Sequence, residues 1–388
     1  MKTRIFKFGG SSFPRLESYN DVARYVSERL ASDTERAVVV VSAMSGTTGR
    51  LLETGSLVNN NMSLETTDSL LGSGEILASA LMRAAIERVE ASVTHLTGYQ
   101  LGIVSDSKFT RARPINYIKK NLKDALKTNK VVVVAGGQAV DGKSRLTMLG
   151  RNSSDLTAVL MASMLGLQEC EIFSDVPGVY SADPYAVKEA RLLREVPYDA
   201  IIEMSRAGSK VLHYGCVAHA KQSGVRIICR SAKDGQIGSI IGSGLPMPMI
   251  AVNKNIVIVR FTSESALSMA ESILRSEGIV AVRITDQSGV FRLSIWTDNR
   301  AWQEVSNALN LELEESKEGA LVTTLDGSGH LNQELVPKDQ VEDYVKRLHA
   351  SFYGHVSPCG TPHAIQKDRA EFSGVLVGVA PEERPIAG

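Results

Sequence analysis

The sequence lacks a net charge, and this absence narrows the classes of partner. Lys and Arg together number 43, as do Asp and Glu, over 388 residues. Without a surplus of one sign, no broad electrostatic attraction to nucleic acid or to an anionic membrane surface is expected. The balance favours a small molecule as the partner, with no nucleic acid and no membrane.

Cysteine is scarce, and long apolar runs are missing. Cys170, Cys216, Cys229 and Cys359 stand without pair spacing, so no disulfide framework is expected. The sequence also shows no signal peptide and no apolar run of membrane-spanning length. Together these absences predict a soluble protein of a reducing compartment, with the cytoplasm as its location.

The length allows two or three domains, and the apolar pattern changes near residue 248. Continuous apolar runs at 38–41 and 131–135 are typical of parallel strands buried on both faces. Helices are predicted over 16–30, 69–89, 115–127 and 154–165. This alternation predicts a layered α/β domain over residues 1–248. Its last part, rich in Gly, Ser and Pro from 235, is expected to be a linker or a late edge of the domain.

Past residue 248, short strand and helix units follow one another. Strands are predicted at 255–261, 279–285 and 290–296, with helices at 264–276 and 300–309. This order is that of a ferredoxin-like module. A second, less complete unit is predicted from a strand near 321–325, a helix over 338–352 and a strand near 372–379. Residues 249–388 are therefore expected to form two small modules of a regulatory type.

A glycine-rich segment follows the first predicted strand. It reads Lys7-Phe8-Gly9-Gly10-Ser11-Ser12-Phe13, with a lysine, two glycines and two hydroxyls where the strand ends. Glycines let backbone N–H groups close on a polyphosphate, and a lysine supplies charge to the transferring oxygens. An ordinary loop has a similar composition, so the segment alone leaves a phosphate cradle and a plain turn both open.

Two further segments carry candidate binding residues. The hydroxyl residues from Ser42 to Thr48 stand just past a buried strand, where open α/β sheets bind ligands or where a helix is capped. Glu75 is predicted in the first turn of an apolar helix that opens at Gly72. There it complements the helix dipole or binds a substrate ammonium group.

Three more candidate segments lie farther along the chain. Arg151 and Asp155 flank small polar residues at a helix start, where an arginine suits a substrate carboxylate and a plain N-cap is the alternative. A strand ending in Ser174-Asp175 leads into a loop suited to a nucleotide or simply to a surface turn. Lys210 lies near a predicted helix end, where it meets a phosphate or complements the dipole.

All five segments occur in the order, and at nearly the spacing, of the aspartokinases within the amino-acid kinase family, which this sequence resembles. The resemblance covers residues 1–243, and the tail has the size of the family's paired ACT modules. It implies an enzyme that phosphorylates the side-chain carboxylate of L-aspartate with Mg-ATP. The product, 4-phosphoaspartate, begins the route to lysine, threonine and methionine. A homodimer or larger homo-oligomer joined through the tail is also expected.

The resemblance implies roles for individual residues. Lys7 would neutralise the transferring phosphoryl group, and Asp155 would organise that lysine. Glu75 would meet the ammonium group of aspartate, and Arg151 a carboxylate. The other implied substrate contacts are Ser42, Thr48 and Ser154. The other implied nucleotide contacts are Gly9, Gly10, Ser11, Ser174, Asp175, Tyr180, Asp183 and Lys210. No protein metal ligand is implied, because ATP carries the Mg²⁺.

Three departures from the family pattern bear on substrate and regulation. Asn152 and Ser153 stand where the family usually has two glycines, which is expected to add two side chains beside the substrate carboxylate. Tyr185 replaces an arginine that would lie near the ATP phosphates. The usual Asp-x-Pro-Gly turn of the tail is missing, with Thr262-Ser263-Glu264-Ser265 in its place. An aspartate analogue as substrate and a tail without feedback inhibition therefore stay open.

Two different functions compete with this one. Residues 137–144 match the Walker A pattern literally, with Asp175 as the Walker B acid. A P-loop needs a helix that starts at Lys143-Ser144, and Gly150 would break a helix there after one short stretch, so we expect no P-loop. A kinase-like amino-acid sensor without turnover is the other alternative, and the retained charged residues of the site argue against it.

A group of metal-ligand residue types near the end of the chain is the last candidate. It comprises His349, His355, Cys359 and His363. Their spacing matches no recognised zinc motif, so a solvated polar loop is expected there.

Overall fold

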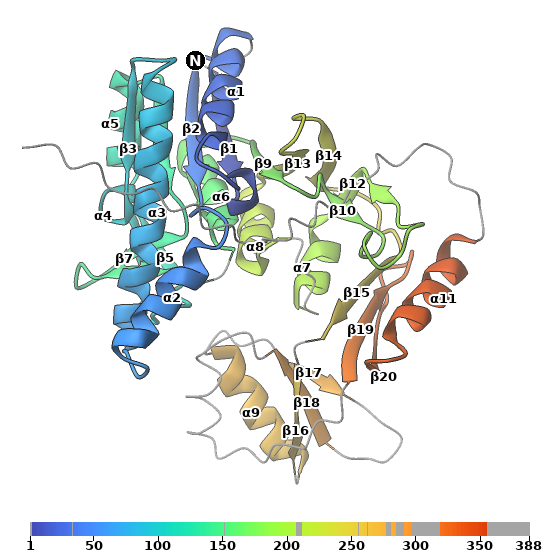
Figure 1. Ribbon diagram of the computed structural model, residues 1–388. Helices are drawn as coiled ribbons and strands as arrows, with labels where there is room; N and C mark the ends of the chain where they lie inside the picture. Colours follow the sequence, from blue (N-terminus) through green and yellow to red (C-terminus); the bar gives the residue numbers. More distant parts are fainter. Residues whose placement is uncertain are drawn as a thin grey trace, which may run out of the picture. The chain divides into compact units, whose positions relative to one another are not determined.

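The computed structural model describes residues 2–32, 34–150, 152–206, 212–254, 256–261, 263–276, 281–284, 291–296 and 319–354. Its largest sheet has eight strands in the order β12-β14-β13-β9-β1-β2-β6-β3 (Figure 1). From β13 to β3 neighbouring strands are parallel, whereas β14 is antiparallel to β13. The predicted α/β architecture is thereby confirmed.

The chain also forms helices and smaller sheets. The strands of the eight-stranded sheet are β1 (Thr3–Phe8), β2 (Arg36–Val41), β3 (Val93–Leu96), β6 (Val131–Ala135), β9 (Glu169–Ser174), β12 (Glu195–Pro197), β13 (Arg226–Ser231) and β14 (Ile237–Gly242). The helices are α1 (Ser18–Ser32), α2 (Thr47–Val58), α3 (Leu64–Glu87), α4 (Gly98–Leu101), α5 (Lys120–Thr128), α6 (Ser154–Leu165), α7 (Tyr198–Arg206) and α8 (Tyr214–Ser223). A four-stranded sheet contains β5 (Pro114–Tyr117), β4 (Ile103–Ser105), β7 (Gln138–Asp141) and β8 (Leu146–Met148), and a hairpin contains β10 (Val179–Tyr180) and β11 (Leu192–Leu193).

Successive side chains of the central strands point to opposite faces of the sheet, and each face has its own hydrophobic core. In β2, Val38 and Val40 face a core shared with α6 and α8, whereas Val39 and Val41 face one shared with α1 and α3. All four valines are fully buried. Burial stabilises each by about 1.5–3 kcal/mol relative to exposure, which is why a continuous apolar run marks a strand covered on both faces.

The predicted helices were found with different accuracy. The helix over 154–165 is confirmed as α6, and the first helix is shifted by two residues. The helix predicted from 69 begins earlier, at Leu64, because the Ser63 hydroxyl accepts the N–H of Thr66 and caps it. The helix predicted over 115–127 is wrong in its first part, where β5 pairs with β4 as an edge strand. A proline at the first residue suits that edge position.

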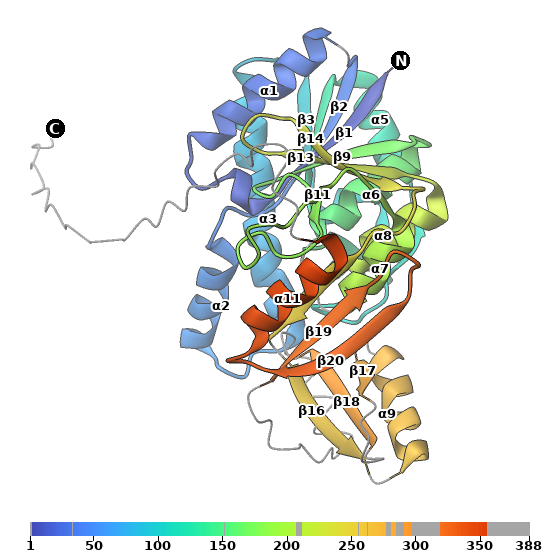
Figure 2. The same cartoon turned by 90° about the vertical axis from the view of Figure 1, so that its right-hand side faces the viewer.

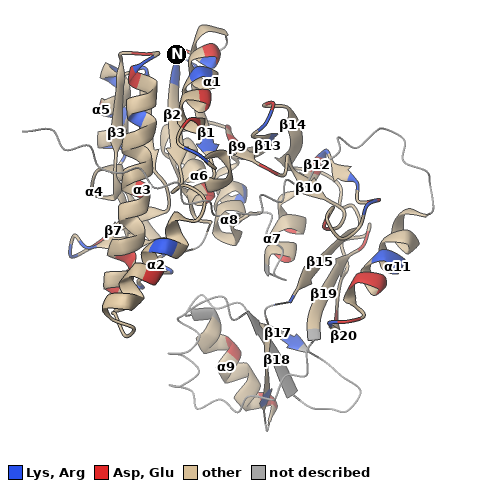
Figure 3. Ribbon diagram, viewed as in Figure 1, with Lys and Arg blue, Asp and Glu red and all other residues tan. Residues whose placement is uncertain are grey.

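One expectation about apolar runs needs correction. Within the described part of the chain, α3 is long and apolar enough to cross a membrane by length and composition. Its Ala78, Met82 and Ile86 are buried in the core beneath α1, as in the core helix of a globular domain. Elsewhere, acidic and basic residues are interspersed on α1, α2 and α11, in keeping with the balanced charge (Figure 3). Three cysteines, at 170, 216 and 229, are buried and unpaired, and Cys359 lies outside the described residues.

Two three-stranded sheets follow residue 248. The first contains β16 (Ile256–Phe261), β18 (Phe291–Trp296) and β17 (Ala281–Ile284), with α9 (Glu264–Ser276) packed on it. The second contains β15 (Met249–Asn253), β19 (Gly319–Leu325) and β20 (Leu331–Pro337), and α11 (Val341–Tyr353) lies along β19 and β20 (Figures 1 and 2). The elements β16, α9, β17, β18, β19 and α11 were predicted close to their bounds, whereas the strands β15 and β20 were not predicted. The helix predicted over 300–309 and the strand predicted over 372–379 lie outside the described residues.

The second tail module is interrupted in sequence, which the prediction of consecutive modules missed. β15 pairs antiparallel with β19, from Met249 opposite Leu325 to Asn253 opposite Leu321. The β16–β18 module is therefore inserted between two strands of its neighbour. The stretch expected to be a linker or late edge contains β14, a strand of the large sheet. Compactness divides the chain into residues 1–354 and 355–388, and the proposed domain boundary near 248 stays a prediction.

Candidate active site

The ends of four adjacent strands bring the predicted segments together. In register, Phe8 of β1 lies opposite Val41 of β2 and Phe173 of β9, and Val41 lies opposite Ala135 of β6. The segments that follow these strands therefore start at one edge of the sheet (Figure 1). Open parallel sheets bind their ligands at this edge.

Lys7 and Asp155 form the centre of this edge. Lys7 shares a strand face with Ile5, which points toward the core of α6, and Asp155 stands in the first turn of α6. The lysine Nζ lies 2.7 Å from Asp155 Oδ1, and the two side chains are only 11% and 8% exposed. Removing one partner of such a pair leaves a buried charge uncompensated. Asp155 thus fixes the lysine, whose ammonium group has three donors, so that some remain for a ligand.

Gly9 and Gly10 provide space that another residue would fill. A Cβ on Gly9 would lie 3.1 Å from Lys7 Nζ, and one on Gly10 would lie 2.7 Å from the carbonyl oxygen of Ala43. The residues after Gly9 form a single 3-10 turn, with Ser11 exposed on it. This close backbone approach beside a lysine is what a phosphate cradle requires.

Glu75 reaches the same edge from the middle of α3, not from its first turn as predicted. Its Oε2 accepts the N–H of Ala43 at 2.9 Å. Burial raises the pKa of Glu75 to about 8, against the opposing effects of the Ala43 N–H and the Lys7 charge. A cation bound beside this carboxyl would favour its ionised form, so Glu75 is suited to an ammonium group.

Ser42 and Ser154 join the end of β2 to the start of α6. The Ser42 hydroxyl donates to Ser154 Oγ at 2.9 Å. Gly136 makes this contact feasible, since a Cβ there would lie 2.5 Å from Ser154 Oγ and 2.8 Å from the carbonyl oxygen of Val41. Gly136 was not among the predicted residues, although a glycine pair directly after a buried strand indicates a close approach of another segment.

The Walker-like segment is part of a hairpin. Lys143 and Ser144 stand in the turn between β7 and β8, which pair antiparallel. Lys143 is exposed, and the chain continues into a strand, not a helix. The expectation that this segment is no P-loop is confirmed.

The segment predicted to bind a nucleotide begins where β9 ends. The Ser174 hydroxyl donates to Asp175 Oδ1 at 3.0 Å, and half-buried Tyr180 follows on the β10–β11 hairpin. Asp183 is exposed, and its Oδ1 accepts the N–H of Tyr185 at 2.9 Å. These residues lie on one continuous loop after β9, which is consistent with a shared ligand.

Of the three remaining predicted residues, the structure describes only Thr48. Thr48 is exposed in the first turn of α2. Its neighbour Thr47 lies against α3 beside Glu75, since a Cβ on Gly74 would be 3.3 Å from Thr47 Cγ2. Arg151 and Lys210 lie outside the described residues, so their roles stay predictions.

Comparison with known proteins decides the family. The sequence profile of the amino acid kinase family matches residues 2–231. An aspartokinase from Bacillus sp. (strain MGA3) is 31% identical over 348 residues, which is 84% of each chain. The chain belongs to the amino acid kinase family, in its aspartokinase branch. An aspartokinase from Helicobacter pylori is 35% identical over 261 residues, covering 65% of this chain and 64% of that protein.

A solved structure shows the same fold. The crystal structure of E. coli aspartokinase III in complex with aspartate and ADP matches with a TM-score of 0.73 at 22% identity. The match covers 91% of this chain and 100% of that chain. The fold of this chain is therefore that of an aspartokinase.

Two departures from the usual aspartokinase motif have different consequences. Asn152 is exposed and has a φ of 58°, a left-handed conformation that asparagine adopts more readily than most residues. Ser153 is 2% exposed, and its hydroxyl donates to the carbonyl oxygen of Gly150 at 2.6 Å. The expectation that both residues extend beside a substrate is therefore wrong for Ser153, which turns back into its own loop.

Three polar groups near the site were given no individual role from the sequence. The Nδ1 of His213 and the hydroxyls of Tyr19 and Ser12 are enclosed and have no hydrogen-bond partner among the described residues. Burial lowers the pKa of His213, with Asp155 acting in the opposite direction. Burial and the nearby Glu75 raise the pKa of Tyr19 to about 12. No local pattern marks such groups, because their burial depends on the packing of distant elements.

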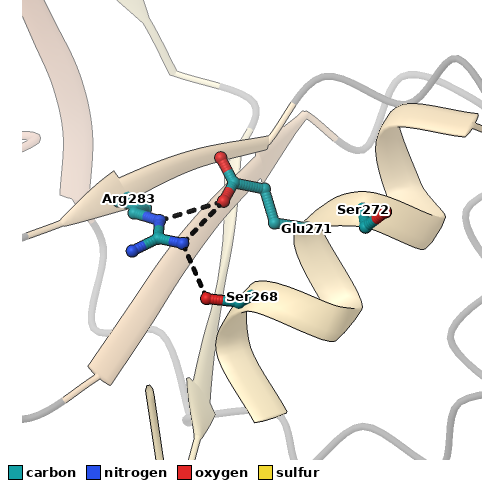
Figure 4. Close-up of a pocket in the computed structure, with 4 residues that line it drawn as sticks. All are labelled: Ser268, Glu271, Ser272 and Arg283. Carbon is teal, nitrogen blue, oxygen red and sulfur yellow. Dashed lines mark hydrogen bonds and ion pairs between the residues drawn. The ribbon is translucent and has the colours of Figure 1, made fainter. Parts of the chain in front are cut away.

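The other candidate sites lie apart from this one. A hollow of about 330 Å³ between α9 and β17 is lined by Ser268, Glu271, Ser272 and Arg283 (Figure 4). There Arg283 donates to Glu271 at 2.9 Å and to Ser268 Oγ at 2.9 Å, so its charge is already paired. None of the residues predicted for the kinase site lines this hollow.

The zinc candidate is not assembled by the described residues. Among them, no group of three or more His, Cys, Asp or Glu side chains is arranged to hold a metal ion. His349 is buried in α11 and not in the solvated loop expected for it. Its candidate partners His355, Cys359 and His363 lie outside the described residues.

Proposed function

We propose that the protein is an aspartate kinase, which transfers the γ-phosphoryl group of ATP to the side-chain carboxylate of L-aspartate. The observation that carries the proposal is the Lys7–Asp155 pair, 2.7 Å apart between the glycine segment and Glu75. Relatives named aspartokinase that match over most of the chain support this substrate.

The transfer needs no protein nucleophile. The side chain of aspartate is already ionised at neutral pH. One of its oxygens bonds to the γ-phosphorus while the bond from phosphorus to the β–γ bridging oxygen breaks, and ADP leaves with that electron pair. Catalysis then consists of positioning and charge neutralisation, which Lys7 supplies and Asp155 supports.

We assign separate sets of residues to the substrate and to the nucleotide. Glu75 would hold the ammonium group of aspartate, and Arg151 a carboxylate. The other residues assigned to the substrate are Ser42, Thr48 and Ser154. Those assigned to the nucleotide are Gly9, Gly10, Ser11, Ser174, Asp175, Tyr180, Asp183 and Lys210.

Mg²⁺ fits this site as a companion of ATP. It supplies further neutralisation of phosphate charge when bound. The space beside Gly9 and Gly10 suits phosphates, and Asp155 is already paired with Lys7.

The test is formation of acyl phosphate, trapped as a hydroxamate, with L-aspartate, L-glutamate and N-acetylglutamate compared. Lys7→Ala is expected to lower kcat by about 10²–10³, because it removes a charge that acts on the transition state. Lys143→Ala is the matched control, since that lysine is exposed in a hairpin turn, and it should leave kcat unchanged. Absence of turnover with aspartate in the natural protein would refute the proposal.

We infer that the enzyme acts at the start of the lysine, threonine and methionine routes and that it works in the cytoplasm. We also infer a homo-oligomer joined through the tail. Light scattering on the purified chain tests this assembly.

A further inference from the structure

The loop that carries Tyr180 and Asp183 is built into the core of a tail module. Ala182 and Val187 of the loop are buried in one cluster with residues of the β15-β19-β20 sheet and α11. The tail members of that cluster are Ile250, Ala320, Val322, Val336, Val341 and Val345. The position of the loop therefore depends on residues that follow it by 63 to 163 positions in sequence.

Ser181 is the polar centre of this junction. Its N–H donates to the carbonyl oxygen of Arg191 at 2.9 Å, and its hydroxyl oxygen accepts the N–H of Arg191 at 2.8 Å. Its carbonyl oxygen accepts the N–H of Ile250 in β15 at 2.8 Å. The same hydroxyl lies 2.9 Å from Nε2 of His349 in α11. Ser181 is fully buried, so each of these bonds is shielded from water.

His349 is held for this contact by Tyr353, which is itself fixed by two further contacts. It is 3% exposed and stacks on Tyr353, with ring centroids 4.8 Å apart. The Arg191 guanidinium lies over the Tyr353 ring at 4.8 Å, and the Tyr353 hydroxyl donates to the carbonyl oxygen of Pro248 at 2.6 Å. Burial, and next the Arg191 charge, lower the pKa of His349, with Glu189 acting in the opposite direction. The imidazole is therefore neutral at physiological pH and bonds to Ser181 through one tautomer.

We propose that His349 is a positioning residue for nucleotide binding, which acts through Ser181 on the loop between Tyr180 and Asp183. The inference rests on the proposed function, because that function assigns those two residues to ATP. It adds that the tail contributes to the nucleotide site itself. Loss of the imidazole would leave the buried Ser181 hydroxyl with the N–H of Arg191 as a partner but without its bond to α11, which favours rearrangement of the loop.

The experiment uses the full chain and measures both binding and kinetics. Titration with Mg-ADP gives a dissociation constant that does not depend on turnover. His349→Ala is expected to weaken Mg-ADP threefold to tenfold, the range for loss of one buried hydrogen bond. KM for ATP should rise by the same factor, while KM for aspartate stays within twofold. His349→Gln, whose amide can again bond to Ser181, should restore most of the affinity.

Two further variants make the result specific. His330→Ala is the matched control, because that histidine is exposed in the turn between β19 and β20 of the same module. Ser181→Ala removes the other partner of the bond, and it replaces His349→Ala if that variant fails to fold. Combined with His349→Ala, it should add little to the loss of either single variant.

The outcomes separate this inference from the function on which it rests. If the natural protein binds no Mg-ADP, the proposed function itself fails. If it binds Mg-ADP and the folded His349 or Ser181 variants bind equally well, the positioning role is refuted. An equal rise in KM for ATP and aspartate would also refute it, since that pattern indicates general damage.

Discussion

At the residue scale, the role proposed for Glu75 predicts that aspartate binding is coupled to the loss of a proton. With a pKa of about 8, its carboxyl is mostly protonated at pH 7, and only the ionised form attracts an ammonium group. KM for aspartate is therefore expected to fall five- to tenfold, in order of magnitude, between pH 7 and 8.5. The groups that face Glu75 are Lys7 of β1, Tyr19 of α1 and the Ala43 N–H. Initial rates over this pH range give the profile.

Glu75→Gln is the control for this profile. The amide keeps the shape of the side chain but cannot ionise, so KM for aspartate should be high and independent of pH. KM for ATP should change little in either protein. A constant KM for aspartate in the natural protein would show that Glu75 does not receive the ammonium group.

Site residues could be predicted where the sequence around them identified the strand or helix on which they stand. Lys7 and Asp155 were both predicted, and the structure pairs them, because each stands at the end of an element recognisable by its apolar pattern. Ser153 was misjudged, since only the fold shows that its hydroxyl turns to Gly150. His213 was overlooked because its burial next to Asp155 comes from the docking of α8, which no local pattern records.

At the element scale, the docking of α6 on the sheet depends on Gly136. A Cβ there would lie 2.6 Å from Ser154 Cβ and 2.8 Å from the carbonyl oxygen of Val41. Gly136→Ala is expected to destabilise the protein by about 1–3 kcal/mol, because neither neighbour can turn away as a flexible side chain would. The displaced start of α6 carries Asp155, so kcat should fall as well. Urea denaturation and initial rates measure the two effects.

Gly49→Ala in α2 is the control for Gly136→Ala, because it adds the same methyl group at an open position. Nothing lies within 4 Å of a Cβ at that position, and alanine favours a helix over glycine by up to about 1 kcal/mol. Gly49→Ala should therefore raise the free energy of unfolding. If the two variants had the same effect, steric crowding at Gly136 would not explain the role of that glycine.

Helices and strands were predicted best where an apolar sequence pattern continued over the whole element. The apolar runs of β2 and β6, and the apolar helix α6, were placed at or close to their bounds. The start of α3 was missed because a single cap, Ser63, outweighs the apolar pattern used to place it. β5 was mistaken for helix because four residues of an edge strand carry too little periodicity to oppose the helical pattern of α5.

At the scale of the whole molecule, sequence order and spatial order diverge in the tail. The strands β16 to β19 and the helices α9 and α11 were predicted there, but β15 and β20 were not, and the pairing of β15 with β19 was missed. Strands that are distant in sequence pair when their buried faces pack into the same core. The periodicity of a short segment indicates whether that segment is a strand, but not which distant strand is its partner. The same limit hid the contact between His349 and Ser181.

The antiparallel pairing of β15 with β19 makes the inserted module removable. Asn253 lies opposite Leu321, so joining residue 253 to Gly319 through Asn-Gly would give a four-residue hairpin loop, a common length. The shortened chain, without residues 254–318, is expected to fold and to keep Mg-ADP affinity within about threefold, because the cluster around Ala182 remains whole. Circular dichroism melting and titration with Mg-ADP test this.

A chain that ends at residue 248 is the comparison for this variant, because it lacks the whole tail. It loses Met249, Ala251 and Leu325, which belong to the same core as α6 and α8, and it also loses His349. Exposed core of this kind favours aggregation and loss of nucleotide binding. If that short chain folded and bound Mg-ADP as well as the natural protein, the tail sheet would be an attachment and not part of the kinase core. If instead only the chain lacking 254–318 kept both properties, β15, β19, β20 and α11 would be structural components of the nucleotide site.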